Sequence, residues 1–174
     1  MSAENNNEKP PLAIEDAIRE KLAGDTRRNA LDYVAFLRSH GLPLNANEDG
    51  WFVGGWFGSS IAFLVIRGHG KEEEPWAVCL FSCDFGGDGS ADDGLKEAAW
   101  AHARPCKKCH EGWNNCGRAD RTIFGRGFEA LCLSPVVFEN PDAETLESAR
   151  KLTLMLMEKR ATSPADTPDS TSAN

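Results

Sequence analysis

Residues 51–68 read WFVGGWFGSSIAFLVIRG, an aromatic and β-branched run that is interrupted by glycines. Residues of this kind favour strands, and the glycines indicate turns or bulges within the run. A second run of the same character, WAVCLFSCDF, occupies residues 76–85 after the polar turn GHGKEEEP. We therefore predict three antiparallel strands here, with a further short strand at one edge.

Helical patterns lie on both sides of these strands. Apolar residues recur at helical spacing in residues 12–23 and again from Asp25 to about His40. A short helix is predicted from Leu95 to His102, and residues 128–138 are predicted to be extended. The final helix is predicted to start at Asn140-Pro141-Asp142, with Asn as the cap, and to run to about Arg160. This order predicts an α+β fold, a small antiparallel sheet with helices packed on one face.

The composition limits the class of protein. The 174 residues include 27 Asp and Glu against 19 Lys and Arg, giving a net charge of −8, which disfavours general binding to nucleic acid or anionic membranes. No apolar run is long enough for a transmembrane helix, so we expect no membrane association. The N-terminus is polar and lacks a secretory signal, which predicts a cytoplasmic protein.

The ends of the chain differ in composition from its middle. Residues 1–10 and 161–174 are rich in polar residues and are predicted to be disordered. Residues 11–160 then form a single α+β domain, and 41% hydrophobic residues are enough for a packed core. A cysteine-rich metal loop is expected within it, at about residues 104–132.

This loop carries the clearest chemical signal. Cys106 and Cys109 form a C-x2-C pair, Cys116 follows, and Cys132 lies in a later apolar run. A C-x2-C turn directs two sulfurs to one centre, and two sulfurs from later in the chain can complete the tetrahedral shell that structural Zn²⁺ prefers. In a reducing compartment, clustered cysteines are more often metal ligands than disulfides. We predict a zinc site of these four cysteines that cross-links the loop to the strand of Cys132.

Other interpretations of the cysteines stay open. Four thiolates can also hold an iron–sulfur cluster, which would make this a redox protein. His110 could replace Cys116 or Cys132 as a ligand, and Cys132 could be a buried thiol within its apolar run. The sequence C-x-x-C-H also matches c-type haem attachment, but the missing export signal and two further cysteines argue against haem. Cys79 and Cys83 are predicted to share a strand face as structural residues.

The region around the cysteines resembles a group of small uncharacterised bacterial proteins. The similar features are Ala99-Trp100-Ala101, the cysteine loop, Ile123-Phe124-Gly125, Phe128, Cys132 and NPDAETLE at residues 140–147. The resemblance implies a cysteine-rich, zinc-binding segment after a small α+β domain, and it implies no activity. In that group the residue after the second cysteine is usually not His, which argues against a role for His110.

The cysteine loop is also basic. Between Arg104 and Phe128 there are six basic residues and two acidic ones. This charge could contact phosphate beside Trp113, which could stack a base. We favour the simpler interpretation that it offsets the negative charge of four thiolates around one divalent ion. Nucleic-acid binding is therefore an alternative that we consider unlikely.

Many aromatic residues fall in the strand region. They are Trp51, Phe52, Trp56, Phe57 and Trp76. They either belong to the core or line a pocket on the sheet face that the helices leave open. The sequence has no Ser–His–Asp arrangement, phosphate loop or HExxH motif, so we name no catalytic residue. We expect a zinc-containing protein without catalysis of its own that binds a small molecule or a protein partner through the aromatic sheet face. The alternative is a redox-active cysteine or iron–sulfur protein.

Overall fold

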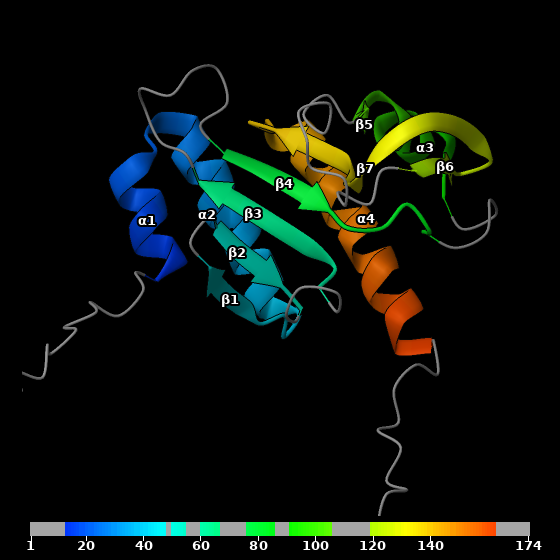
Figure 1. Ribbon diagram of the computed structural model, residues 1–174. Coiled ribbons are helices and arrows are strands. Elements are labelled where there is room, and N and C mark those ends of the chain that lie inside the picture. Colours follow the sequence, from blue (N-terminus) through cyan, green and yellow to red (C-terminus); the bar gives the residue numbers. More distant parts are fainter. Residues whose placement is uncertain are drawn as a thin grey trace, which may run out of the picture.

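The fold is α+β, as predicted (Figure 1). The computed structural model describes residues 13–47, 50–54, 60–66, 76–85, 91–105 and 119–162. The helices in these ranges are α1 (Ile14–Lys21), α2 (Gly24–Ser39), α3 (Asp93–Ala101) and α4 (Ala143–Thr162). The strands are β1 (Leu44–Asn47), β2 (Gly50–Val53), β3 (Ala62–Ile66), β4 (Trp76–Leu80), β5 (Ala103–Pro105), β6 (Ala119–Ile123) and β7 (Arg126–Glu139).

All strand pairs of the sheet are antiparallel. The order is β1-β2-β3-β4-β7-β5, and β6 pairs with β7 outside this path. The first four strands pair in chain order, so β2, β3 and β4 are the three predicted strands and β1 is the predicted edge strand. The sheet is larger than predicted because the long strand β7 also pairs with β4, β5 and β6.

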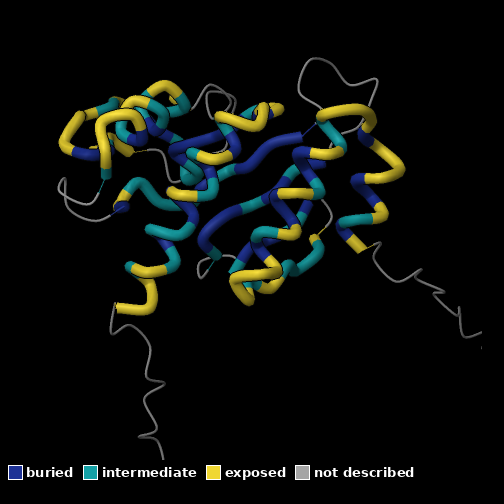
Figure 2. Tube along the Cα trace, turned by 180° about the vertical axis from the view of Figure 1, so that it is seen from behind, coloured by how far each residue is buried: buried dark blue, intermediate teal, exposed yellow. Residues whose placement is uncertain are grey.

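One face of the sheet packs against helices. In Figure 1 helices α2 and α4 lie behind the strands and α1 lies beside them, and Figure 2 shows from behind that exposed residues occupy the outer turns of these helices. Alternate strand residues such as Leu64, Val78 and Phe138 point to this side and belong to one buried core cluster. The period of two along each strand thus selects the residues that the helices cover.

A buried hydrogen bond joins the two longest described helices. The hydroxyl oxygens of Tyr33 on α2 and Thr153 on α4 are 2.7 Å apart. Because Thr153 donates its own proton to the carbonyl oxygen of Ala149 at 2.8 Å, Tyr33 is the donor to Thr153. Burial raises the pKa of Tyr33, so its hydroxyl stays protonated and keeps this role.

The start of the last helix differs from the prediction. Helix α4 begins at Ala143, and the carboxylate of Asp142 accepts the backbone N–H of Thr145 at 2.8 Å, as a capping residue does. Asn140, the predicted cap, has a left-handed backbone with φ of 43° and donates its N–H to the carbonyl oxygen of Trp76. The prediction of Asn140 as the cap was therefore wrong, because Asn140 directly follows the end of β7 and Asp142 caps the helix.

Two further predictions concern the ends of the chain and the membrane. The N-terminal residues 1–10 and almost all of the tail from 161 onward lie outside the described residues. Within the described parts of the chain, no helix is long and apolar enough to cross a membrane.

Candidate metal centre and binding surfaces

The described residues include one of the four predicted zinc ligands. Cys106, Cys109 and Cys116 lie outside the described ranges, as does His110. Cys132 lies in β7, is half-buried and forms no disulfide. No group of three or more His, Cys, Asp or Glu that could hold a metal occurs among the described residues. The strands that border residues 106–118 lie within the described ranges.

The strands on both sides of the cysteine segment meet at one point of β7. Strand β5 ends at Pro105, strand β6 begins at Ala119, and both of these residues pair with Leu131. Paired Cα atoms in antiparallel strands lie about 5 Å apart. The two ends of segment 106–118 are therefore anchored beside the same residue, and Cys132 is the next residue along β7.

A β-bulge precedes Cys132. Ala119 pairs with Leu131 but Arg121 pairs with Phe128, so β7 has one more residue than β6 over this interval. The extra length is taken up at Ala130, whose φ of 54° is in the left-handed region that disfavours side chains. The backbone N–H of Ala130 donates to Oδ1 of Asp120 at 2.9 Å, so the side chain of Asp120 holds the bulge.

The bulge changes which residues of β7 face the core. Phe128 and Leu131 both pack against the core cluster, although residues three apart in a regular strand point to opposite faces. One extra residue reverses the alternation of everything that follows it. Leu131 is fully buried in the core, whereas the next residue, Cys132, is half-buried and belongs neither to the core cluster nor to the residues packed against it.

A second irregularity lies between Leu131 and Val136, the interval that contains Cys132. Pro105 pairs with Leu131 and Ala103 with Val136, so β7 advances by five residues while β5 advances by two. Cys132 thus follows one shift of register and lies within the interval of the second, and β7 is strongly bent in Figure 1. Such irregularities are frequent next to functional sites, where they redirect a side chain.

Helix α3 packs against the hairpin formed by β6 and β7. The indole N–H of Trp100 donates to the carbonyl oxygen of Ile123 at 2.7 Å. The guanidinium carbon of Arg126 lies 5.4 Å from the ring centre of Trp100 and 5.3 Å from that of Phe128. These contacts fix α3, which leads into β5, against the hairpin that follows the cysteine segment.

The hairpin turn itself is strained. Phe124 and Gly125 have φ values of 45° and 77°, the pattern of a tight two-residue turn between paired residues Ile123 and Arg126. The left-handed position of Phe124 is stabilised by packing, since its ring stacks on Phe85 with centroids 5.1 Å apart. The core thus fixes the turn that brings β7 back along β6.

Two of the three described basic residues near the cysteines have acidic neighbours, and the third, Arg126, lies over aromatic rings. Arg104 forms an ion pair with Glu139, and Arg121 lines the same surface hollow as Asp120 and Glu129. A surface that binds nucleic acid needs cations that face phosphate without competing carboxylates. The surroundings of Arg104 and Arg121 therefore do not favour the nucleic-acid alternative.

The second candidate surface is the sheet face opposite the core. Phe52 and Phe63 lie 4.7 Å apart between ring centres, and Phe52 and Phe81 lie 5.9 Å apart. Phe52 is buried, with 7% of its surface exposed, while Phe63 and Phe81 are half-buried, and none of the three belongs to the cluster that the helices cover. Cys79 pairs with Phe63 and so shares this face. We call Phe52, Phe63 and Phe81 the phenylalanine cluster.

The core alternative is confirmed for two of the tryptophans in this region, whereas the predicted shared face of two cysteines is wrong. Trp76 is fully buried in the core and Trp51 packs against it, so neither belongs to the open face. Trp56 and Phe57 lie outside the described residues. Cys83 packs against the core while Cys79 faces away from it, so the two do not share a strand face. The reason is that β4 ends at Leu80, and the alternation of a strand does not continue to Cys83.

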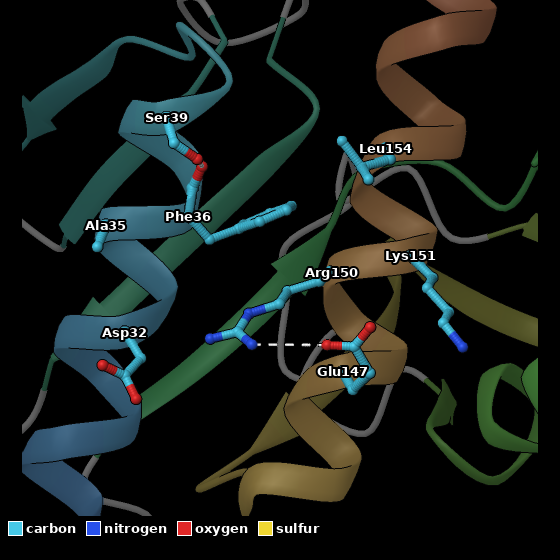
Figure 3. Close-up of a pocket in the computed structure, with 8 residues that line it drawn as sticks. All are labelled: Asp32, Ala35, Phe36, Ser39, Glu147, Arg150, Lys151 and Leu154. Carbon is cyan, nitrogen blue, oxygen red and sulfur yellow. Dashed lines mark hydrogen bonds and ion pairs between the residues drawn. The ribbon is translucent and has the colours of Figure 1, made fainter.

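A groove between α2 and α4 was not predicted from the sequence. It has a volume of about 560 Å³, and Figure 3 shows Phe36 pointing from α2 toward α4. The guanidinium of Arg150 lies 5.7 Å from the ring of Phe36 and 3.5 Å from the carboxylate of Glu147. The hydroxyl of Ser39 also lines the groove and donates to the carbonyl oxygen of Phe36 at 2.8 Å.

Comparisons of the chain with protein-family models, with curated proteins and with solved structures find no match. The resemblance to small bacterial zinc-binding proteins therefore stays a prediction. Asp120 and Ala130 gave no signal in the sequence, because a left-handed Ala is indistinguishable from an ordinary strand residue. Phe63 gave none either, since its strand AFLVI is apolar on both faces.

Proposed function

We propose that the protein is a binding protein without catalytic activity, in which Cys106, Cys109, Cys116 and Cys132 hold one structural Zn²⁺. The observation that carries this proposal is the meeting of Pro105 and Ala119 at Leu131. Cys106 directly follows Pro105, and Cys116 precedes Ala119 by three residues. A chain spans at most about 3.6 Å per residue, so cysteines from both ends of the segment lie within reach of Cys132.

The chemistry of the ligands favours zinc. Four thiolates form a closed tetrahedral shell with no open position for water or substrate, which is typical of a structural site. Such a shell on one divalent ion carries a net charge of −2, and Lys107, Lys108 and Arg118 within the segment would offset it. A site of this kind stabilises the fold and does not activate a substrate.

Strands β5 and β6, which border the cysteine segment, bury little apolar surface. Strand β5 has three residues, of which two are exposed, and β6 buries only Ile123. Strands this short and polar gain little from apolar burial. A zinc ion that joins them to β7 would contribute the free energy that the core does not provide.

The partner surface in this proposal is the phenylalanine cluster. Phe63 and Phe81 are half-buried beside the buried Phe52, on the sheet face opposite the core cluster. Aromatic rings bury much area at low entropic cost and dominate the energetics of many interfaces. A small apolar molecule or a protein partner would bind there, while the zinc keeps the far end of the sheet in place.

Elemental analysis of the purified protein and of Cys109→Ser tests the zinc site. We expect one zinc per chain and no visible absorbance in the wild type, and loss of the metal from Cys109→Ser. Hydrogen exchange should speed up at residues 103–105 and 119–132 of this variant, while α2 and β3 keep their protection. The matched control is Cys83→Ser, which changes a thiol packed against the core and should keep one zinc.

Three results would contradict the proposal. Retention of a full zinc equivalent by Cys109→Ser would exclude Cys109 as a ligand. Iron together with visible absorption bands would favour the iron–sulfur and redox alternative. Salt-sensitive binding of single-stranded nucleic acid that weakens on neutralisation of Arg118 would favour the nucleic-acid alternative.

A further inference from the structure

The groove between α2 and α4 carries charged and apolar side chains in a definite order. Figure 3 shows Asp32 and Glu147 at its lower end, Arg150 in the middle beside the ring of Phe36, and Leu154 at its upper end. Because an α-helix rises about 1.5 Å per residue, Arg150 lies about 4.5 Å along α4 from Glu147 and about 6 Å from Leu154. An acidic end, a guanidinium and an apolar end thus follow one another over the length of a small molecule.

The guanidinium of Arg150 can bind a further anionic group. Its Nε is buried and has no hydrogen-bond partner among the described residues. Its ion pair with Glu147 spans 3.5 Å, which is longer than the roughly 2.7–2.9 Å of a charge-assisted hydrogen bond, and the side chain of Glu147 is 54% exposed. Ion pairs of this kind contribute little to stability. A carboxylate that approached Arg150 would therefore satisfy Nε and replace a loose contact.

The two carboxylates at the lower end of the groove favour a ligand that also carries a positive charge. Asp32 is exposed on α2, and Glu147 would lose its partner once Arg150 bound another anion. A ligand with a carboxylate alone would bring a third negative charge close to these two acids. A ligand with an ammonium next to its carboxylate instead places each charge against its opposite. The half-buried side chains of Phe36 and Leu154 offer apolar contact to the rest of such a molecule.

We propose that this groove binds a free α-amino acid with an apolar side chain. The carboxylate binds the guanidinium of Arg150, the ammonium pairs with Asp32 and Glu147, and the side chain packs on Phe36 and Leu154. The volume of about 560 Å³ is within the range of sites for small ligands. All of these residues belong to α2 and α4, so the site depends neither on zinc nor on the phenylalanine cluster.

Binding of L-phenylalanine to the full-length protein, followed by the chemical shifts of backbone amides, tests the proposal. We expect saturable shifts at residues 32–39 of α2 and 147–154 of α4. Two analogues isolate the two charges of the ligand, since 3-phenylpropionate lacks the ammonium and phenethylamine lacks the carboxylate. Each analogue should bind about tenfold more weakly than phenylalanine, because it leaves charged groups of the groove without a partner.

Two substitutions connect each charge of the ligand to a residue. Arg150→Gln should weaken phenylalanine about tenfold and bind phenethylamine, which has no carboxylate, no more weakly than the wild type does. Asp32→Asn should weaken phenylalanine about threefold, because Asp32 is exposed and its ion pair is screened by water, and should not weaken 3-phenylpropionate. The matched control is Glu158→Gln, which changes an exposed carboxylate of α4 outside the groove lining and should bind all three compounds as the wild type does.

The same titrations contain the results that would overturn the proposal. Equal weakening of phenylalanine and phenethylamine in Arg150→Gln would indicate a general disturbance of the groove and would overturn the pairing of the carboxylate with Arg150. Binding of 3-phenylpropionate as tight as that of phenylalanine, or no saturable shift with phenylalanine, would overturn the amino-acid site. Shifts confined to β2 and β3 would place the binding at the phenylalanine cluster and would also overturn it.

Discussion

Gly50 is the first residue of β2, and the backbone of strand β3 lies close to its Cα. A Cβ at this position would lie 2.1 Å from the carbonyl oxygen of Leu64 and 2.9 Å from the ring of Phe63. A backbone oxygen cannot move aside as a flexible side chain can. We expect Gly50→Ala to lower the free energy of unfolding by about 2 kcal/mol or more, measured by chemical denaturation.

The control for this variant is Gly127→Ala in β7. A Cβ at Gly127 meets no atom within 4 Å, and its backbone is not in the left-handed region. Its unfolding free energy should stay within about 0.5 kcal/mol of the wild type. Equal stability of the two variants would show that β2 and β3 separate more easily than the close contact at Gly50 indicates.

Sequence reasoning at this scale identifies residue types but not their neighbours. The glycines of the strand region are predicted to mark turns or bulges, whereas Gly50 is required by the close approach of Leu64. The four cysteines are predicted as ligands from their spacing alone. Asp120 could not be predicted, because its importance comes from the conformation of Ala130, ten residues away in the chain.

At the scale of the element, Asp142 makes the stability of the start of α4 depend on pH. Hydrogen bonds from the backbone N–H and the hydroxyl of Thr145 lower the pKa of Asp142 below its ordinary value. A carboxylate whose pKa is lower in the folded state stabilises the fold above the unfolded pKa of about 3.9. This contribution is lost as the pH falls through the lower, folded pKa.

The matched substitution is Asp142→Asn. Asn is an equally good capping residue but does not titrate, so the helix keeps its cap and loses the charge. We expect the wild type to be more stable than Asp142→Asn at neutral pH, and the difference to vanish in strong acid. Urea denaturation of both proteins between pH 7 and pH 2 measures this, and a difference independent of pH would contradict the assignment.

The sequence predicts elements well where burial is periodic. Apolar spacing predicts a first helix at residues 12–23, close to the observed Ile14–Lys21. Strands β5 and β6 were not predicted, because β5 is three residues long and β6 has a single buried residue. Both strands depend on pairing with β7, and such pairing leaves no local pattern in the sequence.

At the scale of the whole molecule, the two faces of the sheet have different roles. Helices cover one face, and the core cluster extends from α1 through the strands to α4. The phenylalanine cluster lies on the other face and is not part of that core. The α+β class followed from the order of elements, but which aromatic residues face outward could not be predicted without the register of the strands.

The phenylalanine cluster is predicted to bind an apolar probe in the folded protein. The probe is 8-anilinonaphthalene-1-sulfonate, whose fluorescence rises when it binds apolar surface. We expect Phe63→Ser to weaken its binding about tenfold, because the loss of one aromatic contact costs about 1.4 kcal/mol. The matched control is Phe36→Ser, which removes a half-buried ring from the groove between α2 and α4.

The two variants together decide which surface binds the probe. Weaker binding in Phe63→Ser alone would assign the site to the sheet face, where a partner could then be sought by its apolar character. Weaker binding in Phe36→Ser alone would move the site to the groove, where Arg150 lies over the same ring. No binding by the folded wild type would exclude the phenylalanine cluster as a binding surface.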